Sequence, residues 1–366
     1  MKIKTNELIT KVNNVYKAVG NNKIIPITQM IGIKLNNEVL TLCATDSFNY
    51  FYLSNKIESN EVIDVCVNAD ILSKLINKFT CEETELILEN NYVLITGNGK
   101  YKLDILLDDN GEPFKFPTRE INAKAENQDI DLVKFTNLKF YAEKSLAQTM
   151  EEPDLIAYYV NNEIGIATDK NIMTLVKENI IEKPLTLRPK FVELLTLMKE
   201  KIKFYHWVDE NSANGQIMLA ASDEETTIYS KVNASPDDYP YEAIKDLIDN
   251  AEFTINAKVS IKELISVLDR INLMVTPYDS NTIDLKVSNN TLFISSIKCT
   301  GVEAIPLKEV SSDISWQGKI DIEMLRNQLN SFTKEVVDIY FGNDTCIKLV
   351  EGNTTKLICL VEVEEN

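Results

Sequence analysis

Residues 38–46 read Glu-Val-Leu-Thr-Leu-Cys-Ala-Thr-Asp, and residues 163–169 read Glu-Ile-Gly-Ile-Ala-Thr-Asp. Each stretch alternates in the manner of a half-buried β-strand, and each ends in Ala-Thr-Asp, which predicts a turn at the end of the strand. Residues 290–296, Asn-Thr-Leu-Phe-Ile-Ser-Ser, form a weaker third copy that lacks the Thr-Asp pair. The spacing of the copies divides the 366 residues into three units of similar length, so the chain is expected to be a threefold internal repeat.

Each unit is expected to open with an amphipathic helix and to carry a second helix after its first strands. In the first helix of the chain, Leu8, Val12 and Val15 fall on one stripe, and Thr5 is the expected N-cap. Each second helix leads into two further alternating strands. The six expected helices cover residues 6–19, 71–79, 132–148, 190–200, 261–272 and 321–332.

Two Pro-containing stretches mark the joins between the units. Residues 113–117, Pro-Phe-Lys-Phe-Pro, open a first linker, and residues 235–240, Ser-Pro-Asp-Asp-Tyr-Pro, precede a second linker that ends near Asn250. The sequence therefore predicts three domains, at residues 1–122, 123–250 and 251–366.

The composition predicts a globular cytoplasmic protein. Hydrophobic residues make up 44% of the chain, yet no run reaches the roughly 18 uncharged apolar residues of a membrane helix, so no membrane association is expected. The 6 cysteines form no CxxC pair and mostly sit among apolar residues, which favours buried reduced thiols. The single histidine, His206, is too little for a histidine-rich metal site, and neither a metal nor a cofactor is expected.

The charge is unevenly distributed. With 38 Lys plus Arg against 56 Asp plus Glu, the net charge of −18 argues against a protein that coats nucleic acid nonspecifically. The expected helices together are slightly positive, and two interpretations stay open: ordinary solvated helix faces, or one surface that faces a polyanion inside an acidic body. The helix lysines are Lys11, Lys17, Lys74, Lys78, Lys134, Lys139 and Lys144.

These features resemble the bacterial sliding clamp family, the beta subunit of DNA polymerase III. The resemblance rests on the threefold helix-strand order, on the two Ala-Thr-Asp strands and on residues 24–27, Ile-Ile-Pro-Ile, and it runs from Met1 to about Val363. It implies an α+β fold of three tandem DNA-clamp domains, each with two β-α-β-β-β repeats, outer antiparallel sheets and inner helices. Two chains would join head to tail into a ring.

The function that the resemblance implies is non-catalytic. A homodimeric ring would encircle duplex DNA without sequence preference and tether the replicative DNA polymerase for processive synthesis. Lys23 would join the DNA-facing helix lysines, with Arg188 and Lys190 as a weaker pair. At the dimer interface, Tyr101 would pack near Leu273 and Met274.

The resemblance also implies a cleft between the second and third domains that binds peptides of the polymerase, the clamp loader and other clamp-binding proteins. Its second-domain wall would consist of Thr168, Lys170, Asn171, Ile172 and Met173, with Pro153 or Leu155 nearby. Its third-domain wall would consist of Asp321, Met324, either Cys346 or Ile347, Leu360 and Val361.

Two segments depart from the family pattern. Residues 170–173, Lys-Asn-Ile-Met, replace a Gly-His/Tyr-Arg-Leu motif, and the chain ends in an acidic tail instead of a Met-Pro-x-Arg-Leu-like one. The tail residues Glu362, Glu364 and Glu365 are expected to favour peptides flanked by Lys or Arg.

Two other classes of function are compatible with parts of the sequence. A repeat hydrolase would use Asp46 and Asp169 as catalytic carboxylates, but their recurrence at equivalent places in two domains favours strand-end turns. A protein-binding scaffold of clamp fold is the other alternative, although a scaffold gives no reason to concentrate lysine on the helices.

Overall fold

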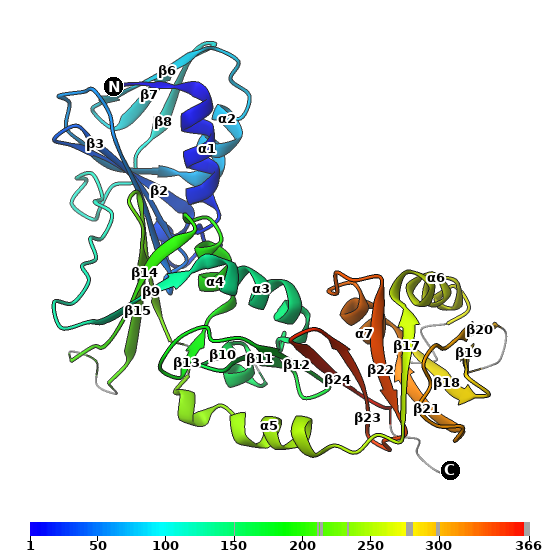
Figure 1. Cartoon of the computed structure of the whole chain (residues 1–366). Coiled ribbons are helices and arrows are strands. Elements are labelled where there is room, and N and C mark those ends of the chain that lie inside the picture. The colour runs from blue at the N-terminus through cyan, green and yellow to red at the C-terminus, as the bar shows by residue number, and fades with distance from the viewer. Residues whose placement is uncertain are drawn as a thin grey trace. The chain divides into compact units, whose positions relative to one another are not determined.

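The structure is a computed structural model that describes residues 1–149, 151–210, 212, 215–232, 234–275, 281–297 and 301–361. The chain divides into two compact units: unit 1 contains residues 1–135 and 190–232, and unit 2 contains residues 136–189 and 233–366. Within the described ranges, each unit holds one eight-stranded and one four-stranded antiparallel sheet (Figure 1). The predicted α+β class is confirmed, whereas the division into three domains stays a prediction.

Unit 1 places two helices, α1 (Thr5–Tyr16) and α2 (Ala69–Ile76), next to its sheets. The four-stranded sheet has the order β1-β6-β7-β8, and the eight-stranded sheet has the order β5-β2-β3-β4-β16-β15-β14-β9. The remaining elements are β1 (Lys2–Lys4), η1 (Pro26–Gln29), β2 (Met30–Asn36), β3 (Val39–Thr45), β4 (Tyr50–Lys56), β5 (Ile63–Asn68), β6 (Glu83–Glu89), β7 (Tyr92–Thr96), β8 (Lys100–Asp104), β9 (Glu126–Asp131), β14 (Lys201–Val208), β15 (Ile217–Ser222) and β16 (Thr226–Lys231).

Unit 2 has the sheet orders β13-β10-β11-β12-β24-β23-β22-β17 and β20-β19-β18-β21. Its strands are β10 (Tyr158–Val160), β11 (Ile164–Thr168), β12 (Ile172–Lys177), β13 (Leu185–Leu187), β17 (Ile255–Ser260), β18 (Thr282–Ser288), β19 (Thr291–Ser296), β20 (Val302–Pro306), β21 (Trp316–Asp321), β22 (Val336–Phe341), β23 (Cys346–Glu351) and β24 (Thr354–Cys359). Its helices are η2 (Glu143–Ser145), η3 (Pro153–Leu155), η4 (Pro236–Asp238), α5 (Tyr241–Asn250), α6 (Ile261–Asn272) and α7 (Ile322–Leu329), while α3 (Leu132–Ala142) and α4 (Pro189–Leu195) carry residues of both units.

Both eight-stranded sheets combine two half-sheets that are distant in the sequence. In unit 1, β4 pairs with β16, and Leu53 lies opposite Thr226. In unit 2, β12 pairs with β24, and Ile172 lies opposite Ile358. Each of these sheets therefore joins strands from two of the predicted domains.

Side-chain caps explain where three of the helices begin. Asn68 Oδ1 accepts a hydrogen bond from the Ile71 amide at 3.0 Å, and Asp321 Oδ1 accepts one from the Met324 amide at 2.9 Å, so α2 and α7 each start with a satisfied donor. Ser260 caps α6 in the same way. The prediction of Thr5 as an N-cap was wrong: Lys4 occupies the cap of α1, and the Thr5 hydroxyl instead bonds to that of Thr84 at 2.9 Å.

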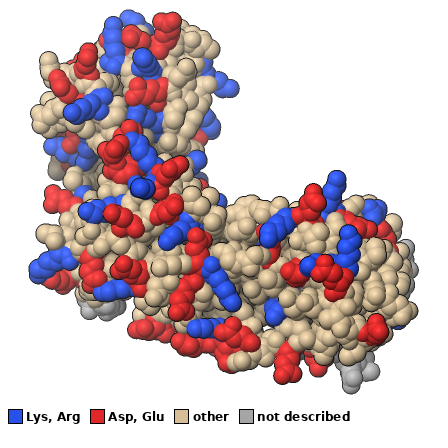
Figure 2. Space-filling model, viewed as in Figure 1, with Lys and Arg blue, Asp and Glu red and all other residues tan. Residues whose placement is uncertain are grey.

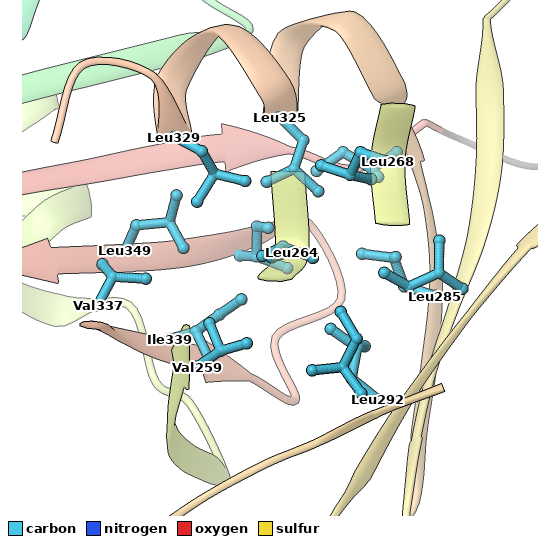
Figure 3. Packing of buried hydrophobic residues seen from close by; sticks show 14 of the residues in the cluster. Val259, Leu264, Leu268, Leu285, Leu292, Leu325, Leu329, Val337, Ile339 and Leu349 are labelled. Carbon is cyan, nitrogen blue, oxygen red and sulfur yellow. The ribbon is translucent and has the colours of Figure 1, made fainter. Parts of the chain in front are cut away.

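One hydrophobic core of unit 2 lies between its helices α6 and α7 and its sheets (Figure 3). Helix residues such as Leu264 and Leu325 point at strand residues such as Leu285 and Ile339, and all four are buried. Full burial of such a side chain stabilises the fold by about 1.5–3 kcal/mol. The apolar periodicity read from the sequence is therefore the packing face of these helices.

The second predicted linker contains a helix that was not predicted. Helix α5 buries Ile244 and Ile248 against unit 2 and exposes Glu242, Asp246 and Asp249. In Figure 2, Lys and Arg are interspersed with Asp and Glu over most of the visible face, whereas acidic side chains gather along α5. The apolar residues had the spacing of a helix, but the Pro-containing stretch that precedes them favoured a linker.

Candidate functional site

The helices α1 and α2 form one antiparallel pair in unit 1. The side-chain amides of Asn13 and Asn77 exchange two hydrogen bonds, at 3.0 and 2.9 Å. One turn further along α1, the Tyr16 hydroxyl donates to Asp70 Oδ1 at 3.3 Å. Because Asn13 pairs with Asn77 and Tyr16 with Asp70, the two helices lie side by side and run in opposite directions.

The predicted DNA-facing residues fall into three groups by exposure. The exposed group consists of Lys17, Lys23, Lys74, Lys78 and Lys144, and the half-buried group consists of Lys134, Lys139, Arg188 and Lys190. Within the described ranges, Lys17, Lys23 and Lys78 have no carboxylate within ion-pair distance, whereas Lys74 pairs with Asp70 at 2.7 Å. The unneutralised positive charge of this part of unit 1 thus lies on and next to α1 and α2.

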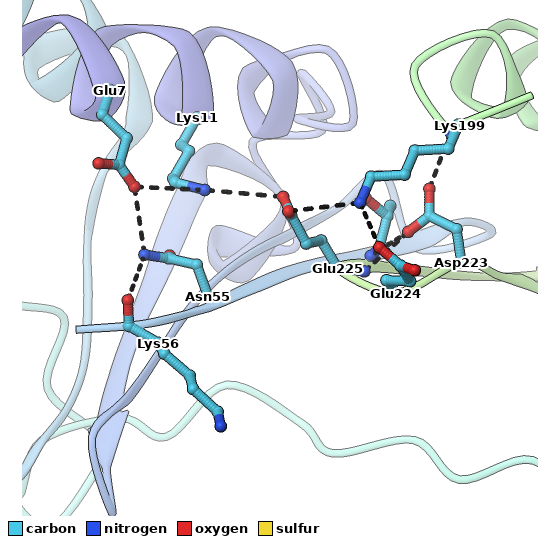
Figure 4. A network of polar contacts seen from close by, with 9 residues as sticks. Glu7, Lys11, Asn55, Lys56, Lys199, Asp223, Glu224 and Glu225 are labelled. Atoms are coloured by element: carbon cyan, nitrogen blue, oxygen red, sulfur yellow. Dashed lines mark hydrogen bonds and ion pairs between the residues drawn. The ribbon is translucent and has the colours of Figure 1, made fainter.

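Lys11 is the buried member of the set. Its ammonium group lies between Glu7 at 3.6 Å and Glu225 at 3.9 Å, and Glu225 also contacts Lys199 at 3.5 Å (Figure 4). The Lys11 side chain therefore links helix α1 to the β15–β16 turn inside unit 1. The two carboxylates neutralise the charge of Lys11. Lys17, one turn and a half further along the chain, has no such partner within the described ranges.

The helix pair α6 and α7 in unit 2 repeats this arrangement with different charges. Arg326 donates to Asp269 Oδ1 at 2.6 Å, and Asn272 donates to Glu323 Oε1 at 2.9 Å, which again defines an antiparallel pair. Arg270 binds both carboxylate oxygens of Glu303. The arginines of this pair are therefore matched by acids, unlike the free lysines of unit 1.

A tight turn carries the first predicted wall of the partner cleft. Asp169 Oδ1 accepts hydrogen bonds from the amides of Asn171 and Ile172 at 2.9 and 2.7 Å, and the Thr168 hydroxyl donates to the Ile172 carbonyl at 2.8 Å. Lys170 at the tip has a φ of 76°, and its ammonium pairs with Glu152. The Thr-Asp pair thus fixes the backbone of the segment that follows it.

The second wall meets the first through backbone hydrogen bonds inside unit 2. The Cys359 amide donates to the Asn171 carbonyl at 2.8 Å, and the Leu360 and Val361 amides donate to Thr345 and Lys319, each at 2.8 Å. The two predicted walls are therefore adjacent in the structure. Residues 362–366, including Glu362, Glu364 and Glu365, lie outside the described residues.

Burial divides the predicted cleft residues into two sets. Leu155, Thr168, Ile172, Cys346 and Ile347 are buried and support the walls from inside. The side chains that reach the surface, fully or in part, are Pro153, Lys170, Asn171, Met173, Asp321, Met324, Leu360 and Val361. Burial raises the pKa of the Cys346 thiol, so this sulfur is neutral and acts as an apolar group.

Sequence reasoning missed one group at this site. Ile244 and Ile248 of α5 belong to the same apolar cluster as Leu155 and Cys346, and Met173 packs against that cluster. The cluster also includes stacked tyrosine rings, with Tyr159 at 5.2 Å from Tyr239 and 4.7 Å from Tyr241. The i, i+3, i+4 spacing of Ile244, Leu247 and Ile248 was the signal that could have found the helix.

The predicted dimer residues lie on exposed parts of the two four-stranded sheets and their helices. Tyr101 is in β8, an outer strand, where it is 39% exposed and its ring lies 5.6 Å from that of Phe79. Leu273 and Met274 follow α6 and are 80% and 47% exposed. All three side chains are accessible at the surface, and their place in a dimer interface stays a prediction.

Asp46 and Asp169 both serve as turn residues, as the preferred interpretation predicted. Asp46 Oδ1 accepts hydrogen bonds from the amides of Phe48 and Asn49 at 2.9 and 2.7 Å, which is the arrangement found at Asp169. Each carboxylate thus has a structural use in its own unit. Among the described residues there is no cluster of three or more metal-ligating side chains, and no helix long and apolar enough to span a bilayer.

Comparisons with known proteins identify the fold. A family model for the N-terminal domain of the DNA polymerase III beta subunit matches residues 1–114. Over the whole chain, the DNA polymerase III beta subunit of Thermotoga maritima aligns with a TM-score of 0.84 at 16% identity, covering 99% of both chains. The DNA polymerase sliding clamp of Bacillus subtilis aligns with a TM-score of 0.81 at 17% identity, covering 99% of this chain and 98% of that one.

The beta subunit of Pseudomonas aeruginosa gives a similar result, with a TM-score of 0.81, 16% identity and 99% coverage of both chains. No curated protein matches the sequence. At these identities the alignments establish the fold, and they confirm the resemblance that the repeats predicted.

Proposed function

We propose that this chain, which has the fold of the bacterial DNA polymerase III beta subunit, is a sliding clamp: a non-catalytic ring that encircles duplex DNA and holds the replicative polymerase on it. The observation that carries the proposal is the way in which half-sheets join. Each half-sheet contains a run of three strands that follow one another both in the sequence and in the sheet. The last strand of each run makes the join, so that β4 pairs with β16 and β12 pairs with β24.

By the same rule, two further strands have a free outer edge in the described part of the chain. β20 is the last strand of its run, as β4 and β12 are of theirs. β8 is likewise the last strand of its run, as β16 and β24 are. Both β20 and β8, however, are outer strands of the four-stranded sheets. Pairing β20 of one chain with β8 of a second completes an eight-stranded sheet and covers two open edges. Done twice, this closes a symmetric head-to-tail dimer.

The charge distribution supports DNA as the ligand of the ring. Lys17, Lys23 and Lys78 are exposed and lack acidic partners within the described ranges, and they lie with Asn13 and Asn77 on or near one helix pair. Such groups make sequence-independent contacts to phosphate, and the acidic remainder of the chain limits nonspecific binding. A mobile, water-screened contact of this kind suits sliding.

The partner site in this proposal is the surface formed by Met173, Met324, Leu360 and Val361. Apolar side chains next to exposed backbone can bind a short extended peptide that inserts Leu or Phe anchors. Its partners are the replicative polymerase, the clamp loader and other proteins that carry a clamp-binding motif.

The decisive experiment is retention on nicked circular DNA before and after linearisation. A ring that the clamp loader has placed on circular DNA stays on it, and slides off the ends once the DNA is linear. A protein that is held by charge alone is retained equally on circular and on linear DNA. Equal retention together with peptide binding would assign the chain to the alternative, a protein-binding scaffold.

The ring is tested by light scattering on the Leu273→Ala/Met274→Ala double variant. The parent protein is expected at twice the mass of the chain and the variant nearer to the monomer. Ile314→Ala, which removes an exposed apolar side chain elsewhere in unit 2, is the matched control and is expected to remain dimeric. A parent protein that is monomeric or trimeric contradicts the dimer.

The DNA-facing helices are tested with Lys74→Glu/Lys78→Glu. Loading is expected to weaken, with the largest loss at low salt, where charge contacts are least screened, while the dimer mass is unchanged. The control is Lys56→Glu/Lys115→Glu, which makes the same charge change at exposed lysines outside the helices. Unaltered loading of the helix variant means that these helices do not face the duplex.

A further inference from the structure

Two cysteines of unit 2 lie directly opposite each other on neighbouring strands. Cys346 is the first residue of β23 and Cys359 is the last residue of β24, and the register of the two strands makes them partners. Neither amide donates to the other residue: that of Cys359 donates to the Asn171 carbonyl at 2.8 Å, and that of Cys346 donates to Asn343 Oδ1 at 3.1 Å. The two cysteines are therefore a non-hydrogen-bonded pair, and in such pairs the Cα atoms of antiparallel strands are only about 4.5 Å apart.

This position has the spacing that a disulfide needs. The Cα atoms of disulfide-bonded cysteines are usually about 4.4–6.8 Å apart, so the backbone requires little movement. Directly opposite residues also point to the same face of a sheet. Here it is the face of Leu357, which clusters with Cys346 and precedes Cys359 by two residues in the same strand. The pKa of the Cys359 thiol is raised by burial and then by the neighbouring Cys346 thiol, as expected of two adjacent sulfurs.

The other described cysteines have no such partner. Cys43 and Cys66 both lie opposite Gly32, one on each side of β2. Since neighbouring strands are about 4.8 Å apart, the Cα atoms of these two cysteines are separated by about 9–10 Å, too far for a disulfide. The Cys81 sulfur contacts the hydroxyls of Thr5 and Thr84. Among the residues that the structure describes, Cys346 and Cys359 are thus the pair with disulfide spacing.

We propose that Cys346 and Cys359 are a redox-sensitive dithiol that a hydroperoxide converts into a cross-strand disulfide. Cys359 is partly exposed and reacts first: its Sγ attacks a peroxide oxygen, the O–O bond breaks, and Cys359 becomes a sulfenic acid. The Sγ of Cys346, which is 2% exposed, then attacks the Cys359 sulfur, the S–O bond breaks, and water leaves. With hydrogen peroxide, two thiols and one peroxide give one disulfide and two water molecules, and the peroxide accepts both electrons.

The surroundings of the pair determine how readily it reacts and what its oxidation changes. Burial raises the pKa of both thiols, so they react more slowly than activated cysteines and respond to sustained oxidation. In the reduced form, the Cys346 thiol donates to Asn343 Oδ1 at 3.6 Å and the Cys359 thiol to the Lys170 carbonyl at 3.5 Å. A disulfide has no S–H group, so both hydrogen bonds are lost on oxidation. The proposal concerns bonds inside unit 2 and is independent of the proposed function.

The test is prolonged exposure of the folded full chain to hydrogen peroxide. Free thiols are then blocked with iodoacetamide in denaturant, and the protein is digested with trypsin without reduction. Because Lys348 and Lys356 lie between the two cysteines, trypsin places Cys346 and Cys359 in separate peptides, which only a disulfide holds together. Mass spectrometry is expected to detect these linked peptides about tenfold above any other cysteine pairing, and dithiothreitol is expected to separate them.

Two variants accompany the parent protein. Cys359→Ser is expected to form no linked peptide and to retain Cys346 as a thiol that iodoacetamide blocks. Cys81→Ser removes another partly exposed thiol and is the matched control, which is expected to form the disulfide as the parent does.

Three results would overturn the dithiol. The first is a parent protein in which Cys359 is oxidised to a sulfinic acid while Cys346 is still a free thiol, because an adjacent thiol traps the sulfenic acid first. The second is oxidation of Cys81 with both thiols of the pair left free. The third is a linked peptide that forms only when the chain is unfolded in urea before oxidation, since the pairing then does not depend on the register of β23 and β24.

Discussion

Replacement of Lys356 by Met probes a buried ammonium group in unit 2. Lys356 is fully buried in β24, where its Nζ donates to the Tyr141 carbonyl at 2.7 Å, to Gln328 Oε1 at 2.8 Å and to the Ser331 hydroxyl. Glu351, the nearby carboxylate, favours the charged form. Burial nevertheless outweighs it and lowers the pKa of Lys356 to about 7.

The direction of the pH effect follows from this pKa. In the unfolded chain a lysine titrates near pH ~10.4, so between about pH 7 and pH 10 the unfolded state holds a proton that the folded state has released. The free energy of unfolding contributed by Lys356 therefore rises with pH, by up to about 1.4 kcal/mol per unit and about 4 kcal/mol over this window. Below about pH 7 both states are protonated and the contribution is flat.

The assay is urea denaturation at several pH values. In a Trp207→Phe background the remaining Trp316 reports on unit 2, because Trp207 lies in unit 1. The unfolding free energy of the parent minus that of Lys356→Met is expected to increase from pH 7 to pH 10. Lys262→Met, at an exposed lysine on α6, is the control and is expected to follow the parent. Parallel curves for the parent and Lys356→Met would refute the displaced pKa.

Three further substitutions test the packing and the backbone of unit 2. Leu264→Ala opens a cavity in the core and is expected to lower the unfolding free energy by about 2–5 kcal/mol in urea, and a loss below 1 kcal/mol would mean that the core collapses around it. Asp321→Ala removes the acceptor of the Met324 amide at 2.9 Å and is expected to cost about 1 kcal/mol by thermal unfolding, whereas Asp321→Asn should retain most of it. Gly342→Ala forces a side chain into a φ of 86° and brings its Cβ to 1.8 Å from Thr254 Oγ1, so a loss of more than about 1 kcal/mol is expected, and an unchanged melting temperature would contradict it.

The sequence by itself determined the features that depend on local chemistry. The six predicted helices are all present, although most are shorter than predicted; the expected helix over residues 132–148, for example, ends as α3 at Ala142. The turns at Asp46 and Asp169 were likewise predictable, because an Asp side chain bonds to amides only two or three residues away. Periodicity and turn chemistry act within a few residues, and the repeat made them easier to recognise.

Only the tertiary structure decided which charges are buried. Lys11 lies on α1 and Lys17 directly follows the helix, yet only Lys11 reaches Glu225, more than half the chain away in the sequence. Lys356 occupies an alternating strand like many others, and its burial depends on the Tyr141 carbonyl, 215 residues distant. No local pattern encodes a partner at that separation.

The same reason applies to α5. Its apolar spacing is helical, but a short acidic segment that follows two prolines forms a stable helix only where a surface covers its apolar face. That surface is built by Leu155 and by Cys346, which come from opposite sides of α5 in the sequence. The sequence therefore determined the repeating elements, while the covered face of α5 and the strand joins arose from long-range packing.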